Sequence, residues 1–179
     1  MKTKSQTKVA MTYGTILGLT GAIVSLVFFF CGADPQSKYP GFISYVLTII
    51  AIIYGVKNYR DQELGGFISY GQSLGTGVLI GLFSGIIMAV FVVLMFTVID
   101  PGLTEKIMDT AQQKMADKSM SEEQMETSLK WARKFMSPPF LFIFSIISSV
   151  FMSFIFSLII SIFMKKEQNP FDNRATDTI

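Results

Sequence analysis

The sequence predicts an all-α, polytopic membrane protein with four transmembrane helices and an extramembrane helical hairpin between spans three and four. Three observations predict this fold class. Half of the 179 residues are hydrophobic and only 16% are charged, against about a quarter in soluble domains. A long polar segment separates the last two apolar stretches. Charged side chains are absent from four stretches, 9–31, 42–56, 74–99 and 138–164.

The lengths of these stretches fit a bilayer. At 1.5 Å of rise per residue, the first, third and fourth reach about 34, 39 and 40 Å, enough to cross roughly 30 Å of hydrocarbon. The second reaches only about 22 Å, so we expect it to extend over 39–59, with the rings of Tyr39 and Tyr59 at the two interfaces. We therefore expect a single domain, with spans over about 9–31, 39–59, 73–99 and 138–164.

Polar residues mark the expected ends of the helices. Ser69 and Gln72 stand at capping-box spacing, so the third helix is expected to begin before its apolar run. After the third span, Pro101 is expected at the first position of the next helix. Ser137 is expected to cap the fourth span.

The polar segment 102–136 carries two apolar stripes at helical spacing, with Ser121 and Gln124 again at capping-box spacing. It is expected to form a helical hairpin that rests on the membrane or on itself. Trp131, next to basic residues and just before span four, is typical of an interfacial anchor. The segment 165–179 is a polar tail.

Small residues recur at every fourth position in three of the spans. Lipid provides no hydrophobic drive for helices to associate, so close backbone approach and interhelical hydrogen bonds must hold them together. Antiparallel spans three and four are expected to pack with Ser73 near Ser161, Gly81 near Ser153 and Ala89 near Ser145. The expected helix-packing residues are Gly14, Gly18, Gly77, Gly81, Gly85, Ser145, Ser149, Ser153 and Ser157.

We call these rows of small residues ridges, and two other interpretations of them stay open. Gly-x-x-x-Gly is also a dimerisation motif, so the ridges could join copies of the chain into a homo-oligomer. The serines of span four could instead line a polar path. Serine in a membrane helix often bonds to the carbonyl four residues back, however, so its polarity alone is weak evidence for a pore.

The reactive residue types exclude several kinds of chemistry. The chain has no histidine, which excludes Ser-His and Cys-His nucleophile activation and histidine-containing zinc sites. Cys31 is the only cysteine, and no carboxylate lies inside a span. We therefore predict no catalytic residue, cofactor or metal site. Tyr70 and Gln72 form a candidate polar site, although a cap at the end of the span explains them equally well.

The connection after span two contains Arg60, Asp61 and Glu63. These charged residues could bind lipid headgroups or a partner, or could form only a solvated turn. The net charge of +2 gives no reason to expect nucleic acid as a partner.

The run from Gly65 to Gly77 (GGFISYGQSLGTG) precedes a glycine-rich span, and a charged helical insertion precedes the last span, which ends at Lys165-Lys166. In these features the chain resembles a family of unknown function, DUF4199, which comprises small membrane proteins found mainly in the Bacteroidetes. The resemblance covers nearly the whole chain. It implies four helices in the bacterial inner membrane and implies no activity.

The sequence favours a non-enzymatic role, in which the protein assembles, scaffolds or regulates membrane partners. The alternative is a passive transport or channel-like component for a small or lipid-like solute, and an enzyme acting on lipids comes third. Both termini are expected in the cytoplasm, because the basic residues on their side lie next to the span ends. The lipid bilayer is the expected surrounding, with a membrane protein or a second copy as partner.

Overall fold

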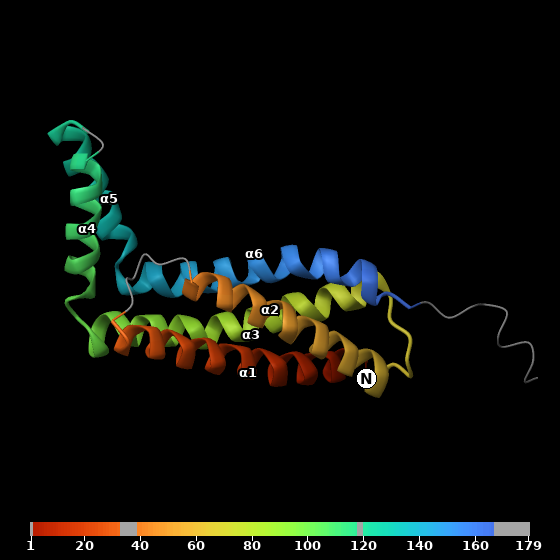
Figure 1. The fold of residues 1–179 in the computed structure, drawn as a ribbon. Coiled ribbons are helices and arrows are strands. Elements are labelled where there is room, and N and C mark those ends of the chain that lie inside the picture. The colour runs from red at the N-terminus through yellow and green to blue at the C-terminus, as the bar shows by residue number, and fades with distance from the viewer. Residues whose placement is uncertain (1, 33–38, 118–119, 167–179) are drawn as a thin grey trace, which may run out of the picture.

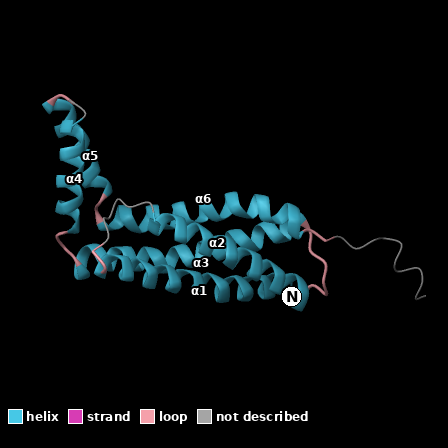
Figure 2. Cartoon of the chain, viewed as in Figure 1, coloured by secondary structure: helices cyan, strands magenta, loops and turns pink. Residues whose placement is uncertain are grey.

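The computed structural model describes residues 2–32, 39–117 and 120–166, and its regular elements there are helices (Figures 1 and 2). In chain order they are α1 (Lys2–Phe30), α2 (Tyr39–Asn58), the π-helix η1 (Tyr59–Glu63), α3 (Tyr70–Leu94), the π-helix η2 (Met95–Ile99), α4 (Leu103–Asp117), α5 (Glu122–Phe135) and α6 (Pro138–Met164). Four segments, 5–30, 41–63, 70–99 and 138–164, are long and apolar enough to cross a membrane. The predicted fold class is therefore confirmed. The tail beyond Lys166 lies outside the described residues.

The four long helices lie side by side in a bundle (Figure 1). Helix α3 contacts α1, α2 and α6, and α2 in turn contacts α1 and α6. Helices α4 and α5 pack on each other at one end of the bundle and run across its axis, away from the end that holds the N-terminus (Figure 1). The hairpin predicted between spans three and four is thus present and lies outside the bundle.

Local hydrogen bonds set the start of two helices, as their sequences predict. The backbone N–H of Gln72 donates to Ser69 Oγ at 3.3 Å, and the Ser69 N–H donates to Gln72 Oε1 at 3.0 Å. Ser121 and Gln124 form the same reciprocal cap at the start of α5. Both capping boxes are therefore confirmed, and α3 begins before its charge-free run.

The prediction for Pro101 is wrong. Helix α4 begins at Leu103, and Pro101 lies in the preceding turn, which closes through a hydrogen bond from the Leu103 N–H to the Asp100 carbonyl at 3.0 Å. The Asp100 carboxylate accepts a hydrogen bond from Lys106 Nζ at 2.7 Å.

Ser137 occupies the N-cap position of α6, but its hydroxyl does not cap the helix. It donates instead to the carbonyl of Lys134 at 2.8 Å. Pro138 and Pro139 fill the first two helical positions and have no N–H to donate, so few donors remain for a capping oxygen.

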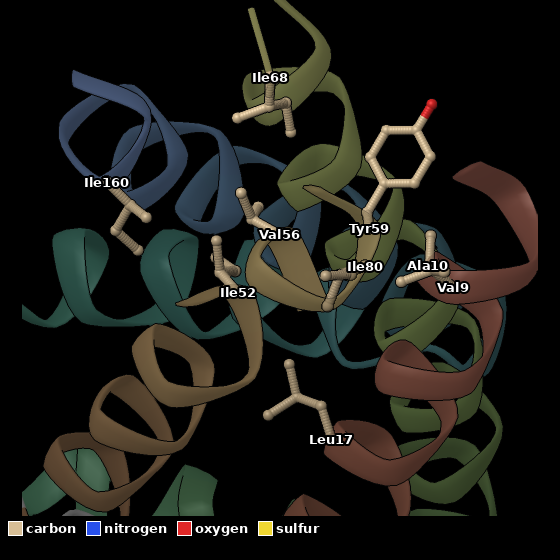
Figure 3. Packing of buried hydrophobic residues seen from close by; sticks show 9 residues of the cluster. All are labelled: Val9, Ala10, Leu17, Ile52, Val56, Tyr59, Ile68, Ile80 and Ile160. Atoms are coloured by element: carbon tan, nitrogen blue, oxygen red, sulfur yellow. The ribbon is translucent and has the colours of Figure 1, made fainter. Parts of the chain in front are cut away.

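A buried apolar cluster joins residues of α1, α2, η1, α3 and α6 with Ile68 (Figure 3). Tyr59 is only 1% exposed and belongs to it, so its ring packs inside the bundle and does not face the surrounding lipid. The side chain of Tyr39, expected at the other interface, lies outside the described residues. The cluster consists of Val9, Ala10, Leu17, Ile52, Val56, Tyr59, Ile68, Ile80 and Ile160.

A short bridge closes one end of the bundle. The N–H of Ile68 donates to the Lys166 carbonyl at 2.9 Å, and the Lys166 N–H donates back to the Ile68 carbonyl at 3.0 Å. Gly65 and Gly66 have φ of 67° and 92°, which side-chain-bearing residues rarely adopt, and they turn the chain from η1 into this bridge. The entry to α3 and the exit from α6 are thereby held together.

Candidate functional site

The small residues of α3 face the serines of α6. A Cβ added to Gly77 would meet the Ser157 side chain, and one added to Gly81 would meet the Ser153 side chain. An added Cβ at Gly85 would lie 2.9 Å from Ser149 Cβ. The two helix backbones therefore approach as closely as glycine allows, in the register that the four-residue spacing predicts.

Hydrogen bonds join the same two helices. Ser161 Oγ donates to Ser73 Oγ at 2.8 Å, and both side chains are buried. Ser149 Oγ donates to the Gly81 carbonyl at 2.9 Å. Ser145 is half-buried one turn before Ser149. Hydroxyl groups on α6 therefore bond across the interface to α3.

The ridge of α1 also contacts α3. An added Cβ at Gly14 would lie 2.7 Å from Phe83 Cβ, and one at Gly18 would lie 2.8 Å from Ile87 Cβ. All three small-residue ridges thus face neighbouring helices of the same chain. Their packing surfaces are occupied within the bundle.

Tyr70 and Gln72 lie near each other but make separate contacts. The Tyr70 hydroxyl donates to the Leu158 carbonyl on α6 at 3.4 Å. The side chain of Gln72 caps α3, and its backbone carbonyl accepts hydrogen bonds from Gln6 Nε2 at 3.2 Å and Thr76 Oγ1 at 2.7 Å. Gln6 Nε2 also donates to Thr76 Oγ1 at 3.1 Å. These polar groups bond to one another and tie α1 and α6 to α3.

A small pocket of about 140 Å³ lies where the four membrane helices meet. Its polar lining consists of hydroxyl groups from α2, α3 and α6, and none of the described side chains that line it is charged. Ser84 Oγ lies 3.3 Å from Ser149 Oγ, and Thr48 Oγ1 donates to the Ser44 carbonyl at 2.8 Å. Such a pocket can hold a few water molecules or a small neutral polar group by hydrogen bonding.

A second cavity system lies between α1 and α2. Tyr13 and Tyr54 line both an apolar cavity of about 180 Å³ and a polar one of about 180 Å³ toward the end of α2. The polar cavity is lined by Lys57, Asn58, Asp61 and Gln62. We call the two cavities together the α1–α2 groove.

Ionisable groups do not gather into a metal-binding cluster. In residues 2–32, 39–117 and 120–166, no group of three or more carboxylate or cysteine side chains is placed to hold a metal ion. The pair Arg60–Asp61, with Nε 2.7 Å from Oδ1, lies on η1 beside the groove. The arrangement can bind polar or amphiphilic molecules through hydroxyls, amides and one lysine.

Sequence reasoning missed three contributors to these sites. Gln6 lies four residues before Ala10 and thus continues the ridge of α1 by one turn, a signal that could have identified it. Tyr54 and Lys57 share a helix face three residues apart near a span end, the place where amphipathic side chains meet lipid headgroups. The position of Tyr54 beside the same cavities as Tyr13 depends on tertiary structure, so the sequence gives no signal for it.

The family model described as a protein of unknown function (DUF4199) matches residues 12–166, which extend from α1 through α6. No curated protein matches the chain. No solved structure matches it either. The match covers well over half of the sequence and agrees with the resemblance carried by the Gly65–Gly77 run. This multi-pass helical membrane protein therefore belongs to the DUF4199 family.

Proposed function

We propose that this protein is a non-enzymatic scaffold of the bacterial inner membrane, which holds the α4–α5 hairpin at the membrane surface to engage a membrane-protein partner. The hairpin carries this proposal. It runs across the end of the bundle, and α5 contacts the bundle at α6 (Figure 1). A hairpin placed in this way presents most of its surface outward.

Charge is separated along α5. Glu122 and Glu123 lie in its first turn, and Arg133 and Lys134 lie in its last turn, next to the membrane-spanning α6. An aromatic cluster anchors this basic end, with the rings of Trp131 and Phe135 6.2 Å apart. Aromatic and basic side chains suit the lipid interface, which leaves the acidic end for a partner with a basic surface.

The alternative, a passive conduit, has less support. It would need the serines of α6 to face water in a multimer. Ser153, Ser157 and Ser161 are at most 1% exposed and face α3. A scaffold needs a rigid bundle, and serines used for internal packing fit that role.

The test is purification of the full chain in mild detergent, followed by quantitative mass spectrometry. We expect a membrane protein at near-stoichiometric abundance. The triple variant Glu122→Gln, Glu123→Gln and Glu126→Gln should lose it, because the acidic end of α5 loses its charge. Asp109→Asn with Asp117→Asn, which removes two acidic charges from α4, serves as the control and should keep it.

Two results would contradict the scaffold role. One is the absence of any stoichiometric protein from the native preparation. The other is flux of a small solute into proteoliposomes that contain only this chain, at rates above those of empty liposomes. The second result would favour the conduit.

The orientation we propose places both termini in the cytoplasm and the hairpin on the outer side. Lys57, Arg60 and Lys165 lie next to span ends on the terminal side, where cytoplasmic basic residues are enriched. Cys31 is exposed and follows α1 at the opposite end. A membrane-impermeant maleimide added to intact spheroplasts should label Cys31, and labelling only after permeabilisation would reverse the topology.

A further inference from the structure

The α1–α2 groove combines an apolar length and a polar end in the way an amphiphile does. We propose that it binds one glycerophospholipid, with part of an acyl chain against the apolar section and the phosphate at Lys57. This inference is independent of the scaffold role.

The two sections of the groove are adjacent. Tyr13 on α1 and Tyr54 on α2 line both cavities, so these two side chains mark the boundary between the apolar and the polar section. The apolar section is lined mainly by Ile16, Leu17, Leu47, Ile50 and Ala51. A tyrosine has an apolar ring and a polar hydroxyl, so two of them suit the level at which acyl chains meet headgroups.

The junction is built by close packing between the two helices. A Cβ added to Gly55 on α2 would lie 3.3 Å from Cγ of Tyr13. The absence of that Cβ lets the Tyr13 ring lie against α2 at this point. Farther along, Leu17 and Leu47 line a cavity of about 180 Å³ between the two helices.

The volume of the apolar section fits part of one acyl chain. A cavity of about 150 Å³ holds benzene, so about 180 Å³ accommodates a segment of roughly six carbons. The remainder of the chain would extend into the surrounding bilayer. Leu17 and Leu47 also line the hydroxyl pocket, which lies beyond the apolar section.

The charges at the polar end favour a phosphate. Asp61 is already paired, because its two carboxylate oxygens lie 2.7 Å from Arg60 Nε and 3.3 Å from Arg60 Nη2. Within the described part of the chain, no carboxylate lies within ion-pairing distance of Lys57. Asn58 and Gln62 add amide donors beside it. The Lys57 charge also acts on Asp61, but Lys57 and Arg60 carry two positive charges against the one carboxylate of Asp61. The excess positive charge and the neighbouring amides match a phosphate diester.

The experiment is thermal unfolding of the detergent-purified full chain, titrated with dioleoylphosphatidylglycerol or with dioleoylglycerol. The two lipids have the same acyl chains, and only the first has a phosphate. A ligand that binds the folded state raises the unfolding temperature with concentration. We expect saturable stabilisation by the phospholipid at one lipid per chain, counted by native mass spectrometry, and little by the diacylglycerol.

Matched variants locate the site. Lys57→Gln should weaken the apparent phospholipid affinity about tenfold, the loss typical of one charge-assisted hydrogen bond. Lys8→Gln removes an equal charge at the same end of the bundle but outside the groove, and it should bind like the native chain. Ile50→Trp should obstruct the groove, whereas Ile53→Trp on the same exposed side of α2 should not.

Specific outcomes would overturn the assignment. Equal losses in Lys57→Gln and Lys8→Gln would show only a general attraction to anionic lipid. Equal stabilisation by both lipids would show that the phosphate does not contribute to binding. Retention of several lipids per chain, insensitive to Ile50→Trp, would indicate ordinary boundary lipid. Unfolding temperatures measured without lipid show whether a variant is merely less stable, and Lys57 is exposed, so its loss should not impair folding.

Discussion

Replacing Gly81 with leucine tests the packing on which the bundle depends. Gly81 lies at the middle of the α3–α6 contact, where an added Cβ would meet the Ser153 side chain and lie 3.1 Å from the Ser149 carbonyl. The first obstacle is a side chain held against α3, and the second is backbone of α6. The substitution can therefore be accommodated only if the two helices move apart.

The cost has two parts. Inserting bulk into a packed interior destabilises a protein by about 1–3 kcal/mol. Separation also breaks the hydrogen bond from Ser149 Oγ to the Gly81 carbonyl, and such interhelical bonds contribute on average about 0.6 kcal/mol in a membrane protein. Together we expect a loss of about 2–4 kcal/mol, or roughly 4–16 °C in unfolding temperature if the scaling for soluble domains of this size applies.

The assay is thermal unfolding of the purified chain in a mild detergent. Gly71→Leu is the matched control, because Gly71 lies in the same helix and an added Cβ there would meet nothing within 4 Å. We expect the control to unfold within a few degrees of the native chain. Equal melting of Gly81→Leu and the native chain would refute the packing argument, and so would an equal loss in the control.

Three further predictions concern substitutions within and beside the bundle, each measured by thermal unfolding or denaturant titration. A double-mutant cycle on Ser73→Ala and Ser161→Ala should give a coupling of about 0.6–1.7 kcal/mol, since their hydroxyls bond at 2.8 Å; zero coupling would mean that the bond does not form. Gly66→Ala should cost about 1–2 kcal/mol, because φ is 92° there, and an unchanged stability would contradict that conformation. Ser157→Ala should be neutral or stabilising, because within the described residues the buried Ser157 hydroxyl has no hydrogen-bond partner; a loss above about 1 kcal/mol would reveal a hidden bond.

The features predictable from the sequence are those that local rules determine. The lengths of the stretches without charged residues predict the four spans, and α6 begins and ends at the predicted residues 138 and 164. The two capping boxes follow from spacing along a single turn. The register of α3 on α6 also follows, because a short hairpin makes the two helices antiparallel and small residues every fourth position mark the face of each.

The features that were missed depend on contacts between distant segments. Tyr59 looked like an interfacial ring because it ends an apolar run, but η1 continues the helix and carries the ring into the cluster with Val9 and Ala10 (Figure 3). The bond from Gln6 to Thr76 joins residues 70 positions apart. The turn at Pro101 was missed because proline is compatible with both a turn and a first helical position.

Helix α2 explains both the limit of the prediction and the position of the groove. Helices α1 and α6 each approach α3 through small residues, so the position of each backbone against α3 is closely defined. Helix α2 has no continuous ridge of small side chains, although Ala51 and Gly55 stand four residues apart, and its buried apolar side chains in the core include Ile52 and Val56. When a helix packs through branched side chains, its sequence defines less strictly which of its faces points to the core. Such side chains also leave gaps between the helix backbones. The α1–α2 groove lies along this helix because nothing in α2 draws its whole length against α1, and lipid is the component available to fill that gap.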